Sequence, residues 1–364
     1  MVKMLGILWY LFWLMVLGPA RAEAQPQVSA ASYLLMESQT GQVLLAHRGE
    51  EKRPPASTTK ILTCITAMDL ADPDELVSVS ANADRVGDAT IYLSTGEIFD
   101  LRSLLQGALI KSGNDAAVAI AEQVAGDEHL FMDLANRKAR ILGAVNTEFY
   151  NPHGLPHPKH VTTAYDLALI TRYAMGNEDF AAMVGTKETV IMSLDGRRKV
   201  YLVNTNKLLW NNPEVTGVKT GTTNKAGMCL VSAAAKDGRE LIAVVLKSRD
   251  RYADAERLLN WGFEEFALQS LNEVLGILVL DVAGGAPACV TARPSYDAAW
   301  SVPKHQRLEI QVELTGPLQA PIRRGETVGT VTVSLAGKEL ETVPLVAGED
   351  VLSHRPKRFW LFKN

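Results

Sequence analysis

The apolar pattern of the chain changes near Ser270, and this change constrains the fold more than any other feature. Before Ser270, runs with helical spacing alternate with strand-like runs. After it, segments such as LEIQVELTG and TVGTVTVSL alternate apolar and polar residues, with Gly and Pro between them. A length of 364 residues also suits about two domains. We therefore expect a mixed domain over residues 25–269 and a small all-β, sandwich-like domain over residues 270–350.

The mixed domain has strand-like runs at both of its ends and a helical middle. Because strands at the two ends of a domain can meet in one sheet, we expect an α+β fold, with an antiparallel sheet covered by a helical subdomain. The KSGND segment, residues 111–115, interrupts the helical middle. The expected elements are a hairpin over 31–45, helices over 57–71, 100–142, 164–175 and 253–266, and strands over 215–223, 228–235 and 240–248.

The two termini differ in composition from the rest of the chain. Lys3 precedes an uncharged apolar run over residues 4–18, and small residues follow at Ala20, Ala22 and Ala24. This layout is typical of a secretory signal peptide, which we assign to residues 1–24. An uncleaved membrane anchor is the alternative, since a spanning helix needs about 18 apolar residues. We expect an exported protein with a short cationic-aromatic tail, residues 351–364, that is short for stable membrane anchoring.

Charge and cysteine content exclude two classes of protein. Lys and Arg number 37 against 41 Asp and Glu, and no stretch concentrates basic charge, so nucleic acid is not an expected partner. Three scattered cysteines are too few for a disulfide scaffold or a Cys-rich zinc module. Cys64 and Cys229 lie in apolar surroundings, which predicts that they belong to the core.

Ser57 and Lys60 place a hydroxyl and an amine one helical turn apart. A buried lysine that is kept neutral can take the proton of a serine hydroxyl and make it a nucleophile. The alternative for Ser57 is an ordinary helix N-cap, which is equally common at this kind of position. The spacing alone is weak evidence, because Ser301 and Lys304 repeat it in a stretch without helical pattern.

Two further short patterns supply polar groups of the kinds that a hydrolase needs. Ser112-Gly113-Asn114 places a hydroxyl and an amide in the loop that interrupts the helical segment. Lys219-Thr220-Gly221 lies on a predicted strand, where Lys219 and Thr220 can hold an anion and Gly221 lets a ligand backbone approach closely. Neither pattern is unique, since Ser270-Leu271-Asn272 and Lys111-Ser112-Gly113 repeat them elsewhere.

The three patterns together, in this order and context, form the signature set of serine β-lactamases and penicillin-binding proteins. The sequence resembles the low-molecular-weight penicillin-binding proteins, which are serine-type D-alanyl-D-alanine carboxypeptidases. The resemblance extends from Ser29 to about Phe266, and more loosely into the β domain. Its segments include PPASTTKILT, LIKSGNDAA, FYNPHGLP, GVKTGTTNKAG and RYADAERLLNWGF.

The resemblance implies a role for each catalytic residue. Ser57 is the nucleophile that forms the acyl-enzyme, and Lys60 is its general base. Ser112 and Asn114 supply the proton relay and contacts to the substrate. The backbone N–H groups of Ser57 and Thr222 form the oxyanion hole.

It also implies how the substrate carboxylate is bound. Lys219 and Thr220, next to Gly221, hold the carboxylate, and Arg251 matches a family arginine that assists them. The alternatives are that Arg251 is a surface residue at a helix end and that Lys247 or Arg249 takes the role. The implied substrates are peptidoglycan stem peptides ending in D-Ala-D-Ala, with β-lactam antibiotics as inhibitors and no cofactor or metal.

The residues by themselves leave several different activities open. His153, His157 and His160 suggest a zinc site, but prolines break their segment and no H-E-x-x-H arrangement lies nearby. The same motifs also suit a β-lactamase, a transpeptidase or an inactive binding or scaffold protein. No Glu-x-x-x-Asn arrangement between Asn114 and Lys219 resembles the deacylating glutamate of class A β-lactamases.

Overall fold

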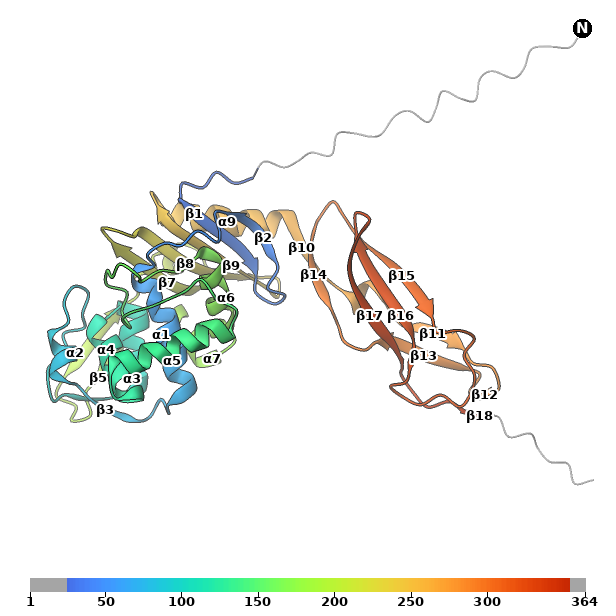
Figure 1. The fold of residues 1–364 in the computed structure, drawn as a ribbon, viewed down its shortest axis with the longest axis horizontal. Helices are drawn as coiled ribbons and strands as arrows, with labels where there is room; N and C mark the ends of the chain where they lie inside the picture. Colours follow the sequence, from blue (N-terminus) through green and yellow to red (C-terminus); the bar gives the residue numbers. More distant parts are fainter. Residues whose placement is uncertain (1–24, 354–364) are drawn as a thin grey trace, which may run out of the picture.

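A computed structural model describes residues 25–353 of the chain. The expected signal peptide and residues 354–364 of the tail lie outside the described residues. The structure consists of a larger α+β body and a smaller β body, which lie side by side (Figure 1). Between residues 25 and 353, no helix combines the length and apolar character needed to cross a bilayer.

The larger body is built on a five-stranded antiparallel sheet in the order β2-β1-β9-β8-β7. The first and last strands in sequence therefore meet in one sheet, as the sequence pattern predicts. β7, at one edge, carries the Lys-Thr-Gly pattern. The strands are β1 (Ser32–Glu37), β2 (Val43–His47), β7 (Val215–Thr223), β8 (Gly227–Lys236) and β9 (Arg239–Ser248).

Both faces of this sheet are buried, as β9 illustrates. Leu241, Ala243 and Val245 of β9 belong to the core beneath helix α9 (Arg251–Glu265). Ile242 and Val244 belong to the core shared with the other helices. A strand buried on both faces needs apolar residues at every position, which explains the uninterrupted run over 241–246.

The helical subdomain packs on the opposite face of the sheet from α9. Asp100 accepts a hydrogen bond from the backbone N–H of Ser103 at 2.7 Å and so caps the N-terminus of α3 (Leu101–Gln106). A π-helical turn, η2 (Gly107–Lys111), ends at Ser112 and interrupts the helical middle. The remaining helices are α1 (Lys60–Leu70), α2 (Ala81–Arg85), α4 (Asn114–Ala125), α5 (Glu128–Ile141), α6 (Ala164–Met175), α7 (Glu178–Gly185) and α8 (Leu208–Asn211).

Two small ribbons within this subdomain were not anticipated from the sequence. Each ribbon has only two strands, so its apolar pattern is too short to stand out. The ribbons pair β3 (Leu76–Ser78) with β4 (Ile98–Asp100) and β5 (Glu188–Met192) with β6 (Lys199–Val203).

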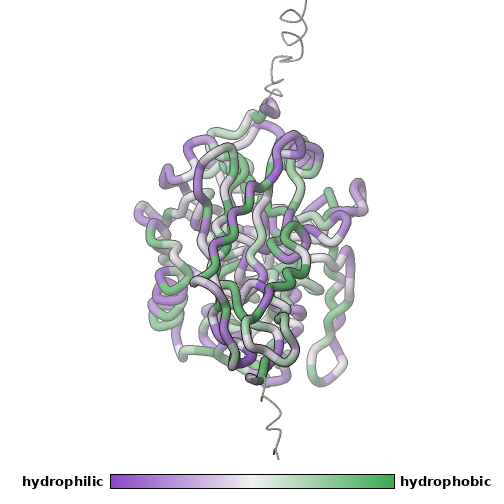
Figure 2. Tube along the Cα trace, turned by 90° about the vertical axis from the view of Figure 1, so that its right-hand side faces the viewer, coloured by the Kyte–Doolittle hydropathy of each residue, from purple (hydrophilic) through white to green (hydrophobic). Residues whose placement is uncertain are grey.

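The C-terminal module has a five-stranded sheet in the order β11-β13-β17-β16-β15. Val302, from a separate ribbon, packs in the same core as Val290 and Val331, so the two layers enclose one apolar interior. Hydrophilic and hydrophobic residues follow one another at short intervals along the part of the trace that faces the viewer in Figure 2. The elements are β10 (Phe266–Ser270), α10 (Leu271–Leu275), β11 (Leu278–Asp281), β12 (Gly285–Ala286), β13 (Cys289–Pro294), β14 (Ala299–Pro303), β15 (Leu308–Leu314), β16 (Thr327–Leu335), β17 (Lys338–Ala347) and β18 (Leu352–Ser353).

The module begins and ends at other residues than expected. Helix α9 ends at Glu265, and the next residues form β10, which pairs with β14 of the module rather than continuing the helix. The β structure therefore starts at Phe266 instead of residue 270. At the other end, Val351 is fully buried and bridges Ile322, so the module continues past residue 350 to Ser353.

A buried polar network joins the two bodies around Ser301. Ser301, in the second Ser-x-x-Lys pattern, lies on the strand β14 and is 1% exposed. Its hydroxyl donates to Glu37 Oε2 at 2.8 Å and accepts from Arg239 Nη2 at 3.1 Å. Gln42 binds both the backbone N–H and the carbonyl of Ser301. The pattern here serves the interface between the two bodies.

Candidate active site

Ser57 lies in a tight turn that leads directly into α1. The turn is a 3-10 helix, η1 (Ala56–Thr59), rather than the first turn of the expected α-helix. Ala56, immediately before Ser57, has a left-handed φ of 52°, a strained conformation of the kind that clusters at functional sites. Thr59, and not Ser57, occupies the N-cap position of α1. The structure therefore gives Ser57 no capping role.

Lys60 is the central residue of the site. Its Nζ lies 3.2 Å from Ser57 Oγ, 2.7 Å from Asn114 Oδ1 and 2.8 Å from the carbonyl oxygen of His153. The side chain is fully buried, and all three neighbouring oxygens are neutral. Burial, together with the nearby charge of Lys219, lowers the pKa of Lys60 well below its usual value. The neutral form of the Lys60 amine is thereby favoured relative to that of an exposed lysine.

Ser112 and Asn114 follow the π-helical turn, and Asn114 contacts Lys60. Ser112 ends that turn with a left-handed φ of 70° and is buried. The Asn114 amide nitrogen donates to the carbonyl of Gly87 at 2.8 Å, which directs the amide oxygen toward Lys60. The loop of residues 87–89 therefore fixes the orientation of Asn114.

Strand β7 forms the opposite wall. A Cβ added to Gly221 would lie 2.9 Å from the carbonyl oxygen of Pro55 and 3.0 Å from the backbone nitrogen of Ser57, so only glycine fits there. Lys219 is also buried, and this burial lowers its pKa to about 7. Thr220 Oγ1 lies 2.6 Å from Thr205 Oγ1, which adds a second hydroxyl at the wall. Sequence reasoning missed Thr205, because a single threonine after β6 carries no distinguishing pattern.

Arg251 reaches this wall from the start of α9. Its Nη1 donates to the carbonyl of Gly221 at 3.0 Å and to Thr222 Oγ1 at 2.8 Å. Asp250 caps α9, so Arg251 is not needed at the helix end. The competing residues Lys247 and Arg249 are both exposed. The structure thus brings Arg251, rather than either competitor, beside the Lys-Thr-Gly strand.

The loop of residues 151–155 packs against α1 and the Ser57 turn. Sequence reasoning did not predict its role in the site. Pro152 accepts a hydrogen bond from Thr63 of α1 at 2.7 Å, and the His153 carbonyl faces Lys60. Gly154, with a φ of 92°, passes so close to Ala56 that any added Cβ would overlap its carbonyl. These contacts use backbone carbonyls and a glycine, which residue-type reasoning does not detect.

The three histidines considered as zinc ligands each make different contacts. His160 accepts from the backbone N–H of Tyr150 at 3.1 Å and lies 2.8 Å from Thr59 Oγ1, so both ring nitrogens are engaged. Burial lowers the pKa of both His153 and His160 to about 3. His157 stacks on Tyr150 instead. Among the residues that the structure describes, no three His, Cys, Asp or Glu side chains group as a metal site.

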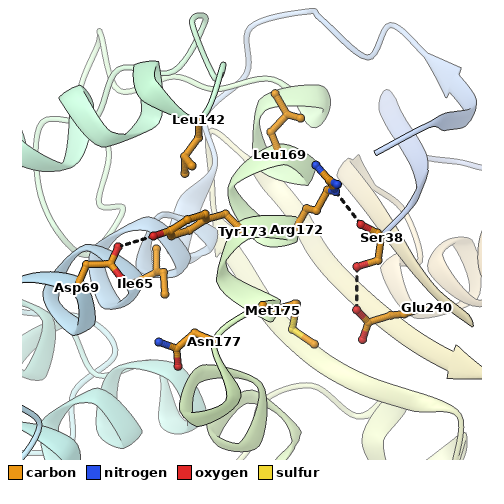
Figure 3. Close-up of a pocket in the computed structure, with 11 residues that line it drawn as sticks. Ser38, Ile65, Asp69, Leu142, Leu169, Arg172, Tyr173, Met175, Asn177 and Glu240 are labelled. Carbon is orange, nitrogen blue, oxygen red and sulfur yellow. Dashed lines mark hydrogen bonds between the residues drawn. The ribbon is translucent and has the colours of Figure 1, made fainter. Parts of the chain in front are cut away.

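A cavity of about 650 Å³ lies elsewhere, between α1, α6, β1 and β9 (Figure 3). Its polar groups already pair with one another: Arg172 donates to the carbonyl of Ser38, Ser38 to Glu240 and Tyr173 to Asp69. None of the motif residues lines this cavity. This cavity is therefore not a second candidate for the active site.

The sequence matches the family described as D-alanyl-D-alanine carboxypeptidase over residues 19–250. The chain belongs to this family. Residues 264–353 match the C-terminal domain of penicillin-binding protein 5, in agreement with the β module that the structure shows.

Members of the carboxypeptidase family resemble this chain over most of its length. The D-alanyl-D-alanine carboxypeptidase DacF of Bacillus subtilis is 32% identical over 336 residues, covering 88% of this chain and 86% of the relative. DacC of Escherichia coli is 33% identical, covering 90% and 85%. The structure of penicillin-binding protein 5 from Haemophilus influenzae superposes with a TM-score of 0.76 at 28% identity, covering 91% of this chain and all of that chain.

Proposed function

We propose that this carboxypeptidase hydrolyses the terminal D-Ala-D-Ala bond of peptidoglycan stem peptides through an acyl-enzyme on Ser57. The observation that carries the assignment is the position of the buried Lys60 amine between Ser57, Asn114 and His153. A neutral amine has two hydrogens and one lone pair. If the hydrogens bind Asn114 Oδ1 and the His153 carbonyl, the lone pair faces the Ser57 hydroxyl and can accept its proton.

In the acylation step, Lys60 takes the proton of Ser57 while Oγ attacks the carbonyl carbon of the penultimate D-alanine. The backbone N–H groups of Ser57 and Thr222 are proposed to stabilise the resulting oxyanion. Support comes from the close approach of β7 to the Ser57 turn at Gly221. The carbon–nitrogen bond then breaks, and the proton passes from Lys60 through Ser112 to the departing amine.

Deacylation follows the same steps as acylation, with water in place of the serine hydroxyl. Lys60 accepts a proton from water, the hydroxide attacks the ester carbonyl, and Ser57 leaves with the proton returned. The products are free D-alanine and a peptide shortened by one residue. The same serine accepts β-lactam antibiotics, whose strained amide resembles the D-Ala-D-Ala bond.

The terminal carboxylate of the substrate is assigned to Lys219, Thr220 and Arg251. Two cationic side chains and a hydroxyl on one wall suit an anion. Gly221 leaves room for the substrate backbone against β7, and Thr222 contributes both its N–H and the hydroxyl that orients Arg251. This cluster restricts the enzyme to the free carboxyl end of a peptide.

The proposal includes export through residues 1–24 and peripheral contact of the tail with the outer face of the cytoplasmic membrane. Lys357, Arg358 and Lys363 supply positive charge, and Phe359 and Trp360 supply aromatic rings. Co-sedimentation of the mature chain with anionic and neutral vesicles tests the tail. Removal of residues 354–364 abolishes binding if the tail is the contact.

Incubation of the purified mature chain with acetyl-lysyl-D-Ala-D-Ala, followed by assay of D-alanine, tests the function. Release of D-alanine with a single penicillin adduct on Ser57 is the expected result. Transfer of the acyl group to an added amine in preference to water would identify a transpeptidase, and absence of any adduct would identify an inactive binding protein.

A further inference from the structure

Tyr92 is a large aromatic side chain exposed to solvent, in the segment whose residues Ala89 and Ile91 contact Asn114 and Gly113. It is 78% exposed, while its neighbours Ile91 and Leu93 are each only 2% exposed. Its φ of 62° is a left-handed conformation that bulky residues rarely adopt. Glycine would adopt this conformation without strain. A tyrosine in this position therefore needs support from its surroundings.

Asp115 provides this support from the Ser-Gly-Asn-Asp segment. Its buried carboxylate accepts the backbone N–H of Ile91 at 3.0 Å and that of Leu93 at 3.0 Å, on both sides of Tyr92. The backbone on either side of Tyr92 is thereby tied to the residue that follows Asn114. Movement of this segment would leave Oδ2 of this buried carboxylate without its partners, which is costly.

Arg198 of the β5–β6 ribbon provides support from the other side. Its Nη2 donates to the carbonyls of Ile91, at 3.0 Å, and of Tyr92. Its Nη1 pairs with Glu97 at 2.8 Å, which balances the charge. The tyrosine backbone is thus held between an acidic and a basic side chain.

The segment that carries Tyr92 forms part of the wall beside Ser112. Ile91 packs so closely on Gly113 that an added Cβ would lie 3.2 Å from Ile91 Cγ2. The backbone N–H of Asn114 donates to the carbonyl of Ala89 at 2.7 Å. Tyr92 therefore lies on the Asn114 wall, whereas the proposed carboxylate site lies on β7.

We propose that Tyr92 is a specificity-determining residue that contacts the side chain of the residue preceding D-Ala-D-Ala in the stem peptide. The inference rests on the proposed function, because it assumes a peptide whose carboxylate is held at β7. An exposed tyrosine ring packs against an aliphatic chain and attracts an ammonium group over its face. The side chain that fits is therefore that of a diamino acid such as lysine.

The test compares two substrates, Nα-acetyl-L-lysyl-D-Ala-D-Ala and acetyl-D-Ala-D-Ala, which lacks that side chain. We expect Tyr92→Ala to lower kcat/KM about threefold to tenfold for the lysyl peptide and less than twofold for the short peptide. Tyr92→Phe keeps most of the selectivity. Tyr201→Ala removes another exposed tyrosine, on β6, and should leave the ratio of the two rates unchanged.

Tyr92→Gly separates recognition from folding. Glycine accepts the left-handed backbone, so the thermal unfolding midpoint stays at or above that of the parent while the selectivity is lost. Equal losses on both peptides, or unchanged kcat/KM on the lysyl peptide, would overturn the proposal. Penicillin labelling of Ser57 continues in every Tyr92 variant, and its loss in the parent chain would instead disprove the proposed function.

Discussion

Lys60 Nζ and Asn114 Oδ1 lie 2.7 Å apart, so a buried amine on α1 is fixed by a neutral amide at the start of α4. The neutrality of that amide matters as much as its position. A carboxylate at the same distance would stabilise the ammonium form of Lys60 and raise its pKa. The site therefore depends on asparagine at position 114 for chemical and not only for steric reasons.

We accordingly expect Asn114→Asp to impair catalysis through Lys60. At neutral pH more of the amine would be protonated, and kcat/KM should fall about tenfold for each unit by which the Lys60 pKa exceeds the assay pH. Relative to the parent enzyme at the same pH, activity should recover as the pH rises. Asn272→Asp, in the repeated Ser-x-Asn pattern, is the matched control. A loss that does not change with pH would contradict this explanation.

The depressed pKa of Lys219, about 7, predicts an alkaline limb in the pH profile. Below pH 7, Lys219 is charged and attracts the substrate carboxylate; above it, the free enzyme loses this charge. We expect kcat/KM for a D-Ala-D-Ala peptide to decline above about pH 7. The alkaline limb of kcat should lie at higher pH, because the bound carboxylate favours the charged lysine. Steady-state rates between pH 5 and 10 measure both limbs.

The two Ser-x-x-Lys patterns should respond differently to removal of the serine hydroxyl. Ser57→Ala should abolish D-alanine release and the covalent penicillin adduct. Ser301→Ala should retain both but lose roughly 1–2 kcal/mol of unfolding free energy, because Glu37 and Arg239 lose a buried partner. Intact-mass spectrometry and urea unfolding measure the two effects. A full adduct on the Ser57→Ala variant would remove the nucleophile assignment.

Penicillin should form an adduct that persists for minutes or longer. Hydrolysis of the adduct needs a positioned water, and the bulky ring retained by the penicilloyl group obstructs it. Between Asn114 and Lys219, Glu122 already accepts from Ser80, and Glu148 from Tyr150. The other glutamates of this interval are Glu128, Glu178, Glu188 and Glu214, of which Glu214 pairs with Lys236. Mass spectra recorded over time decide the matter, and rapid turnover of many equivalents would identify a β-lactamase.

The sequence predicted the α+β fold and the shared sheet, because alternation in the strands and helical spacing after Ser57 are local signals. It also singled out Lys60 and Asn114 by residue type, and the two side chains are in contact. The catalytic roles assigned around Ser57 stay predictions. The family comparisons confirm the fold and the class of enzyme. The burial of Cys64 and Cys229 was also predicted correctly from their apolar neighbours.

The missed features lack such signals. The carbonyls of Gly87 and His153 fix Asn114 and Lys60, but a backbone carbonyl is present at every position of the chain. Thr205 contacts Thr220 because the chain returns from β6 to the edge strand β7. The position of Ser301 depends on how the two bodies pack against each other. Long-range packing determines all of these, and residue type alone does not.

The contacts of Gly154 and Gly221 with the Ala56–Ser57 turn have a consequence for local stability. Backbone from three distant parts of the chain meets there without intervening side chains. One segment cannot separate from the others without breaking this shared contact. The nucleophile turn, the loop behind it and β7 should therefore open as a single cooperative unit, with amide hydrogens that exchange at a common rate.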